Sequence, residues 1–270
     1  MNTASPMLTI LIPHYKTLSL LKLCLQYLKK YTDLNKVKVI VIDNNSEDGT
    51  VEFLRTVKWI KLIERKSNEQ EEPGPMHAKA LDLGLEHVDT PYVLSIHTDT
   101  IIANEKWLDF LIGEIKKAEN IAGVGSWKLE YVSPFKQVMK HIEQFLQTKI
   151  WYPIIGKKDH KISGLGDNYY YLRSHCALYR TELIRKYANG FFDGETAGKV
   201  LHKKLIESGF EMVFLPSEVL IKYIKHLNHA TMILHPELGG KKTATPKAYK
   251  RIIKEMKALN YEEMLNIESL

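Results

Sequence analysis

The sequence YVLSIHTDT at Tyr92–Thr100 decides the fold. Its first part is mostly apolar and ends at His97, Thr98 and Asp99, and a helix-like segment follows at 104–119. An apolar run of this length with turn residues on both sides predicts a buried central strand of a parallel sheet. Ligands bind just beyond the carboxyl ends of such strands in open α/β sheets. We therefore expect a ligand site at His97–Asp99.

His97 and Asp99 are two residues apart, so they would project to the same side of the strand end and can share one cation. Asp supplies a hard oxygen ligand, and the imidazole nitrogen of His suits Mn²⁺ better than Ca²⁺. A purely structural explanation competes with this one: His97 is a hydrogen-bonded loop residue and Asp99 caps the following helix. The motifs elsewhere in the chain favour the metal.

Length and composition set the class of protein. The chain has 270 residues, of which 44% are hydrophobic and 26% charged, as in a soluble globular protein of one large α/β domain or two small ones. No apolar run approaches the roughly 20 residues that cross a bilayer, and Met7–Ile12 is too short for the core of a signal peptide. These features predict a cytoplasmic protein. Cys24 and Cys176 are expected to be free and buried, which suits a reducing compartment.

The formal net charge of +6 favours anionic partners. Basic residues crowd one segment near the C-terminus: Lys241, Lys242, Lys247, Lys250, Arg251, Lys254 and Lys257. Pro246–Leu259 is predicted to be a basic amphipathic helix, which either lies on an anionic membrane surface or packs its apolar side on the sheet domain. No nucleic-acid-binding module is recognisable, so nucleic acid is not expected as a partner. Glu69, Glu71 and Glu72 are expected to form a solvated acidic loop.

Strands and helices alternate along the first half of the chain. Apolar strand-like runs are expected at 8–12, 37–42, 61–64 and 92–96, with helices between them at Leu18–Tyr31, 51–57 and 76–87. This alternation predicts an α/β fold with a mostly parallel, Rossmann-like sheet and helices on both faces. Pro13 is expected to end the first strand. In the second half we expect strands at 122–129, 211–215 and 220–224 and helices at 180–187 and 197–208.

Polar clusters follow the predicted strand ends at Pro13–Tyr15, Asp43–Ser46 and His97–Asp99. Together they would form a crevice at one edge of the sheet, where Asp43 can accept hydrogen bonds from a base or ribose. The sequence has neither a P-loop nor a Rossmann glycine fingerprint. A bound diphosphate would therefore be neutralised by a cation and basic side chains. In the structural alternative, Pro13 only ends a strand and Asp43 only caps a turn.

Several motifs resemble those of the inverting, GT-A type glycosyltransferases of family 2. The first is an apolar strand with Pro-x-Tyr, a helix, a second strand and Asp-x-x-Ser-x-Asp-Gly-Thr, all within Leu8–Thr50. Ala80–Gly84 resembles the family's Ala-x-Asn-x-Gly helix, with Asp82 where Asn is usual. His97–Asp99 occupies the place of the Asp-x-Asp motif, and Gly190–Asp193 resembles the Gly-Gly-Phe-Asp turn. A late His-x-x-Gly-x-Ser/Thr motif has a loose counterpart at His226–Thr231.

The resemblance implies a nucleotide-sugar donor, usually a UDP-sugar with Mn²⁺ or Mg²⁺, and a hydroxyl acceptor on a glycan or glycolipid. The residues expected around the nucleotide are Pro13, His14, Tyr15, Asp43, Asn45, Ser46, His77, His97 and Thr98. The residues expected around the metal are Asp99, His97, His226 and His229.

The resemblance also implies a carboxylate that deprotonates the acceptor. The family's Glu-Asp pair before the catalytic helix is missing, and Asp193 and Glu195 are the carboxylates available there. Glu195 is closest to the helix start and is the first choice for the base, although it can equally cap the positive end of the helix dipole. A second departure is His97, which replaces the first Asp of the metal motif and would alter the use of metal.

The expected organisation is a glycosyltransferase domain at 1–240, with a nucleotide-binding half at about 1–129 and an acceptor and catalytic half at about 130–240. Residues 241–270 would add the basic helix. The two departures motivate an alternative, a catalytically silent protein that binds sugar nucleotides. A nucleotidyltransferase is disfavoured because no glycine-rich phosphate loop follows Ile12.

Overall fold

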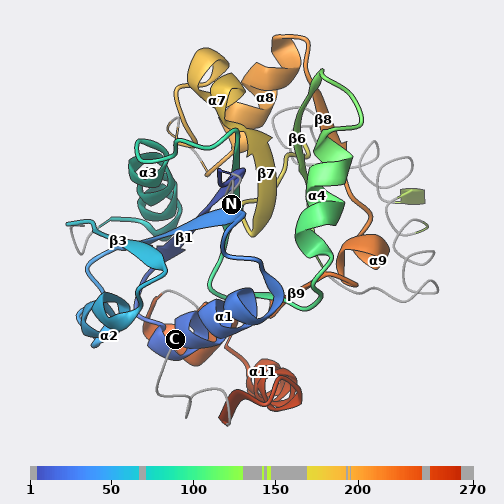
Figure 1. Cartoon of the computed structure of the whole chain (residues 1–270). Coiled ribbons are helices and arrows are strands. Elements are labelled where there is room, and N and C mark those ends of the chain that lie inside the picture. Colours follow the sequence, from blue (N-terminus) through green and yellow to red (C-terminus); the bar gives the residue numbers. More distant parts are fainter. Residues whose placement is uncertain are drawn as a thin grey trace.

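The protein is described from a computed structural model that covers residues 5–66, 71–129, 142, 145–146, 169–192, 194, 196–238 and 244–262. Figure 1 shows the arrangement of its elements, with the strands side by side in a central sheet. Along the chain the elements are β1 (Leu8–His14), α1 (Leu18–Tyr31), β2 (Val37–Asp43), α2 (Thr50–Thr56), β3 (Ile60–Glu64), α3 (Pro73–Leu85), β4 (Tyr92–Ile96), β5 (Thr100–Ile102), α4 (Trp107–Ile115), β6 (Ile121–Gly125), β7 (Cys176–Arg180), α7 (Thr181–Tyr187), α8 (Lys199–Glu207), β8 (Glu211–Phe214), α9 (Ser217–Leu220), β9 (Ile224–His226), α10 (Ala230–Leu234), a 3₁₀ turn at Pro236–Leu238 and α11 (Pro246–Ala258).

The central sheet has the strand order β3-β2-β1-β4-β7-β6-β8. Strands β3, β2, β1 and β4 run parallel, β7 is antiparallel to both β4 and β6, and β8 is parallel to β6. The predicted mostly parallel α/β sheet is therefore confirmed. In the pairing of β1 with β2, His14 lies opposite Asp43, so these two strands end at the same level of the sheet.

Helices cover both faces of this sheet, as the sequence predicts. Alternate residues of β1 project to opposite faces. On one face of β1 lie Leu8, Ile10 and Ile12, which belong to the core that contains α1. On the other face lies Leu11, which belongs to the core that contains α3. Helix α1 has the predicted bounds, and its apolar positions, such as Leu21 and Leu28, are fully buried.

Two expectations about the strands are wrong, and β7 is not predicted at all. Pro13 does not end β1 but lies within it, beyond Leu11, the last residue that pairs with β4. The run predicted as a strand at 220–224 instead closes the short helix α9 and leads into β9. The sequence prediction also missed β7, because this short strand runs directly into α7 with no turn residue between the two elements.

The acidic loop is only partly described, because residues 67–70 lie outside the described chain. Within it, Glu71 is not solvated as expected. Its carboxylate accepts hydrogen bonds from Arg65 at 2.7 Å and from Lys79 at 2.5 Å, and its side chain is only 11% exposed. Arg65 also donates to the side-chain oxygen of Asn44, so the network reaches the turn after β2.

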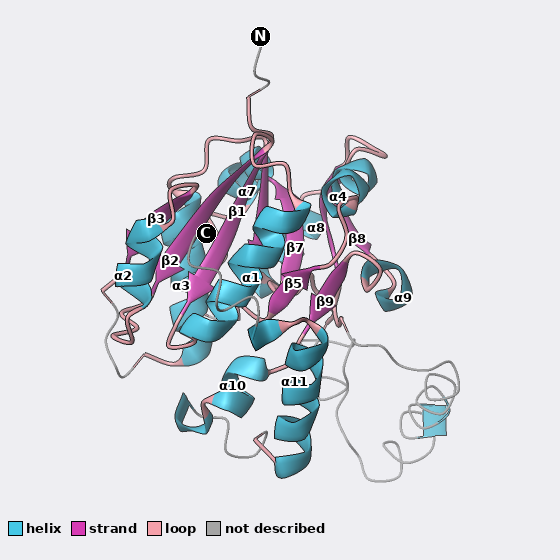
Figure 2. Ribbon diagram, turned by 60° about the horizontal axis from the view of Figure 1, so that its bottom comes forward, coloured by secondary structure: helices cyan, strands magenta, loops and turns pink. Residues whose placement is uncertain are grey.

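Helix α11 packs against the main body through its apolar side. Ile252, Met256 and Leu259 are buried in the same core as α1, and the Tyr27 hydroxyl donates to the Leu259 carbonyl at 3.0 Å. Figure 2 shows α10 and α11 together with the β5–β9 pair at one end of the sheet. In the described part of the chain, no helix combines the length and the apolar character that crossing a bilayer requires.

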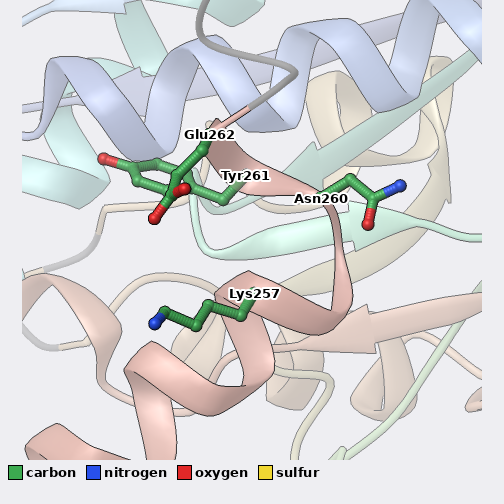
Figure 3. Close-up of a pocket in the computed structure, with 4 residues that line it drawn as sticks. All are labelled: Lys257, Asn260, Tyr261 and Glu262. Carbon is green, nitrogen blue, oxygen red and sulfur yellow. The ribbon is translucent and has the colours of Figure 1, made fainter.

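A pocket of about 350 Å³ lies where α11 ends, lined by Lys257, Asn260, Tyr261 and Glu262. In Figure 3, Lys257 and the ring of Tyr261 project to the same side, and Asn260 projects to the other. None of the site residues predicted from the sequence lines this pocket.

Candidate functional site

The turn after β2 holds Asp43 in a fixed orientation. Asp43 is buried, and its carboxylate accepts hydrogen bonds from the backbone N–H of Ser46 at 3.0 Å and from the Ser46 hydroxyl at 2.5 Å. Burial raises the pKa of Asp43, and the bonds from Ser46 oppose that rise. Asn45, between Asp43 and Ser46 in the sequence, is exposed and adopts a left-handed conformation with a φ of 61°. The turn therefore presents Asn45 at the surface while Ser46 fixes the carboxylate.

The end of β1 lies beside this turn. The backbone N–H of Asn44 donates to the carbonyl of His14 at 3.0 Å, which ties the two strand ends together. The ring of His14 is buried and lies 3.0 Å from the Thr50 hydroxyl at the start of α2. Burial lowers the pKa of His14 to about 4, so the ring is neutral at pH 7. Pro13 is buried as well, and Tyr15 is partly exposed.

A second group lies at the end of β4 and contains His97, Asp99 and His226. The Asp99 oxygen Oδ1 is 3.2 Å from His226 Nε2 and 3.8 Å from His97 Nδ1. One potential ligand atom from each residue lies within 4.8 Å of the others. Thr98, between His97 and Asp99, is buried.

The pairing of β5 with β9 brings His226 to Asp99. Thr100 lies opposite His226 in this antiparallel pair, and the Leu227 N–H donates to the Asp99 carbonyl at 2.8 Å. Two residues that are far apart in sequence thus meet through backbone hydrogen bonds. The predicted metal residues Asp99, His97 and His226 are brought together by the fold.

Ser174 connects His97 to His77. Its hydroxyl oxygen lies 2.9 Å from His97 Nε2 and 3.1 Å from His77 Nε2. The two rings meet edge to face, with centroids 4.6 Å apart. His77, which lies on α3, is therefore beside the group at the end of β4.

His175 completes the cluster from the other side. Its ring stacks on that of His226 at 4.8 Å, and its Nε2 lies 2.9 Å from the Ser126 hydroxyl at the end of β6. Sequence reasoning missed both Ser174 and His175. Their position just before β7 could have identified them. Because β7 is antiparallel to β4, with Cys176 opposite Ile96, the residues before Cys176 lie beside the residues after Ile96.

The electrostatics of the group suit a cation. Burial lowers the pKa of His77 to about 4 and of His175 to about 3, and burial together with His77 holds the pKa of His97 well below 6.5. Burial alone would raise the pKa of Asp99, but His226 and His97 hold it below its usual range. A neutral His97 beside an ionised Asp99 is the combination of protonation states that binds metal.

A test of fit rests on Asp99. Its Oδ1 atom is buried, and it lies 3.2 Å from His226 Nε2 and 3.8 Å from His97 Nδ1. A cation shared by these three atoms would satisfy the buried oxygen together with both ring nitrogens. The side chains present therefore fit a divalent cation at Oδ1.

One predicted metal ligand, His229, is not part of this arrangement. His229 is exposed, has a left-handed φ of 63° and flanks the start of α10; it does not belong to the metal-competent group found among the described residues. Asp193 and Glu195, the predicted catalytic carboxylates, lie outside the described residues. The turn just before them is described: the backbone N–H groups of Phe191 and Phe192 donate to the carboxylate of Asp82 on α3.

The fold is similar to that of a solved mannosyltransferase. The mannosyltransferase PcManGT from Pyrobaculum calidifontis, solved with GDP-Man and Mn²⁺, matches with a TM-score of 0.58 and 18% identity over 98% of this chain and 71% of its own. Glucosyl-3-phosphoglycerate synthase from Mycobacterium tuberculosis was solved with Mn²⁺, UDP and glucosyl-3-phosphoglycerate. It matches with a TM-score of 0.49 and 17% identity, over 93% of this chain and 81% of its own. S. aureus TarS matches with a TM-score of 0.47 and 16% identity, over 74% of this chain and 55% of its own.

No match was found among curated proteins. The family model described as glycosyl transferase family 2 matches residues 9–188, which is more than half of the 270-residue chain. This range contains the turn at Asp43, the group at His97–Asp99 and the Ser174–His175 pair. The chain belongs to glycosyl transferase family 2.

Proposed function

We propose that the protein transfers a sugar from a nucleoside-diphosphate sugar to a hydroxyl group of a glycan or glycolipid, with inversion at the anomeric carbon. The observation that carries this proposal is the position of two groups in a family 2 chain. The Asp43 turn and the Asp99–His226 pair follow β2 and β4, which flank β1 in the central sheet. Carboxyl ends of parallel strands are where α/β folds bind nucleotides.

The nucleoside would lie at the Asp43 turn. An ionised Asp43, already oriented by Ser46, has acceptor capacity left for an N–H of the base or a ribose hydroxyl. Pro13, Tyr15 and Asn45 would border the base. A uridine donor is favoured by the family resemblance, while the solved mannosyltransferase with GDP-Man makes guanosine the competing choice.

A divalent cation, Mn²⁺ or Mg²⁺, would be held by Asp99 with His97 and His226. When bound, it would supply positive charge against the diphosphate, which becomes the leaving group. Thr98 and His77 would lie near the phosphates. The role of the chain itself is to hold these ligands and to bind the nucleotide in one orientation.

The acceptor would be activated by a carboxylate, with Glu195 as first choice and Asp193 as second. A base that removes the proton of the acceptor hydroxyl, opposite the departing diphosphate, leads to inversion by in-line displacement. Asp82 supports this role because it anchors the backbone immediately before Asp193. The acceptor would come from the side of residues 130–240, where Tyr170 is exposed beside Trp127 and can stack on a sugar ring.

A second candidate function is sugar-nucleotide binding without catalysis. The observation that favours it is the histidine at position 97, where the family motif has a carboxylate. Transfer or hydrolysis of the donor separates the two functions, since only a catalyst releases nucleoside diphosphate.

Calorimetric titration with UDP and GDP in the presence of Mn²⁺ tests the nucleotide site. Asp43→Asn should weaken binding of the preferred nucleotide at least about tenfold, because a hydrogen bond to a charged group is worth about 1.5–3 kcal/mol. Asp109→Asn, at an exposed carboxylate on α4, is the matched control and should bind like the wild type. An unchanged nucleotide affinity in Asp43→Asn would show that the nucleoside does not bind at this turn.

A further inference from the structure

We infer that the His97–Asp99–His226 group is a nitrogen-rich site that binds a first-row transition-metal ion without the nucleotide and discriminates against Mg²⁺. The inference deepens the proposed function and rests on it only for the position of the diphosphate. The binding of the ion follows from this chain's own side chains.

The spacing of the three ligand atoms fits one ion. Two donors that share a cation at about 2.1 Å each lie roughly 3–3.5 Å apart. Asp99 Oδ1 and His226 Nε2 are already 3.2 Å apart, and His97 Nδ1 is 3.8 Å from the same oxygen. A small shift of the His97 ring would complete the set. Three protein ligands bind an ion more tightly than a single carboxylate can, so nucleotide phosphates are not needed to retain it.

The chemistry of the donors sets the choice of ion. Imidazole nitrogen suits Fe²⁺, Ni²⁺, Cu²⁺ and Zn²⁺ best, and affinity for divalent ions generally rises from Mn²⁺ through Co²⁺ towards Cu²⁺. Mg²⁺ prefers oxygen ligands and retains several waters. Two of the three donors here are imidazoles, and Asp99 supplies the only carboxylate in the group. Mg²⁺ would have to give up water for nitrogen ligands, which is unfavourable.

Ser174 orients His97 for this role. A serine hydroxyl has one proton, so Ser174 can donate to only one of its two histidine neighbours. If it donates to His77 Nε2 and accepts from the Nε2–H of His97, the lone pair of His97 Nδ1 faces Asp99. Hydrogen bonds of this kind to a ligating histidine fix its tautomer and ring orientation. Ser174 is therefore a positioning residue for the metal site.

The stacking of His175 restricts the other imidazole. With its ring 4.8 Å from that of His226 and 18° from parallel, His175 limits rotation of the ligand ring. The Ser126 hydroxyl in turn holds His175 at 2.9 Å. Both histidine ligands are thus supported by side chains that follow β6 or precede β7, which favours a site already formed before the nucleotide binds.

The test is a titration of the full-length, nucleotide-free protein with Co²⁺, Mn²⁺ and Mg²⁺. Calorimetry measures the binding of each ion, and visible absorption also reports the binding of Co²⁺. We expect one Co²⁺ per chain and affinity for Mg²⁺ at least about 100-fold weaker. His97→Ala and His226→Ala should abolish tight Co²⁺ binding. Ser174→Ala should weaken it roughly 10- to 100-fold, as loss of an orienting hydrogen bond does. His87→Ala, at an exposed histidine, is the matched control.

One variant keeps the test independent of misfolding. His97→Asp replaces nitrogen by oxygen, so it should strengthen Mg²⁺ binding, weaken Co²⁺ binding and lower the ratio of Co²⁺ to Mg²⁺ affinity at least about tenfold. The gain in Mg²⁺ affinity is a change that unfolding cannot produce. Equal Co²⁺ and Mg²⁺ affinities in the wild type, or unchanged Co²⁺ binding in His97→Ala, would overturn the inference. Nucleotide binding at Asp43 is measured separately, so loss of the metal preference with nucleotide binding intact contradicts only this inference.

Discussion

Asp82 on α3 accepts a hydrogen bond of 2.5 Å from the backbone N–H of Phe191, a residue 109 positions further along the chain. Its second oxygen accepts the N–H of Phe192 at 3.1 Å. Gly190 precedes this pair with a φ of +133°, and a Cβ there would collide with the Asp82 carboxylate. One side chain therefore fixes the backbone that leads directly to Asp193.

Asp82→Asn should destabilise the protein and slow the reaction. An amide side chain has only one acceptor oxygen, so one of the two N–H groups loses its partner, at a cost of about 1–3 kcal/mol. We expect a lower denaturation midpoint and a lower kcat, with nearly unchanged donor affinity. Chemical denaturation and steady-state kinetics measure these effects, with Asp109→Asn as the control. Wild-type stability and kcat in Asp82→Asn would show that the turn needs no carboxylate.

Glu195→Gln should lower kcat roughly 10²–10⁴-fold, the usual contribution of a positioned general base. Gln keeps the size and part of the hydrogen bonding of Glu, so donor affinity should hold. The comparison variant is Asp193→Asn, which should have the smaller effect. A loss of donor affinity without a specific fall in kcat would instead assign Glu195 to capping of α8.

The protein should lose stability in mild acid, partly through His202. This ring is 2% exposed and accepts the Leu172 N–H at 3.4 Å, and burial lowers its pKa to about 4. The folded state keeps His202 neutral, whereas the unfolded state takes up a proton near pH 6.5. This contribution is therefore complete above pH 6.5 and is lost as the pH falls towards 4, by up to about 3 kcal/mol.

Urea unfolding at pH 7.5 and pH 4.5 measures the effect. In His202→Gln, which does not titrate, the loss of unfolding free energy between the two pH values should be smaller than in the wild type. An equal loss in both proteins would show that His202 does not contribute to acid sensitivity.

The basic side of α11 should bind anionic vesicles through charge alone. Lys247, Lys250, Lys254 and Lys257 are exposed, but the apolar side of the helix is already buried in the core. Each basic residue near anionic lipid contributes up to about 1 kcal/mol, and salt screens this attraction. We expect flotation with vesicles at low salt and release at high salt.

Charge reversal at two of these lysines is the matched test. Lys250→Glu with Lys254→Glu should abolish flotation, whereas Lys58→Glu with Lys61→Glu, an equal change of charge near β3, should not. A full-length protein that stays unbound at low salt would leave α11 with a structural role only.

The sequence predicts the first half of the fold well because each strand there is followed by a helix of clear periodicity. The sequence predicts a helix from about Leu18 to Tyr31, in agreement with α1, and it predicts the strands that lead to Asp43 and end at Ile96. The second half is harder. Its antiparallel strand β7 is short and runs directly into α7, so no turn residue marks where the strand ends.

The residues of the candidate site likewise differ in how well the sequence predicts their positions. Asp43 and Asp99 follow recognisable strands, so their positions could be predicted. His226 is a predicted ligand, but its contact with Asp99 depends on the pairing of β5 with β9, and each of these strands has only three residues. Ser174 and His175 needed β7 to be identified first. Contacts made by short, non-local strands carry little signal in a single sequence.

The most direct test of the account is donor turnover across a panel of UDP-, GDP- and dTDP-sugars in the presence of Mn²⁺, with release of the nucleoside diphosphate as the readout. The account predicts that one donor class is consumed, most readily UDP-sugars, and that Asp99→Ala abolishes the release while the fold is retained. If no nucleotide sugar is bound or consumed, or if Asp99→Ala turns over the donor like the wild type, the proposed transferase site is contradicted.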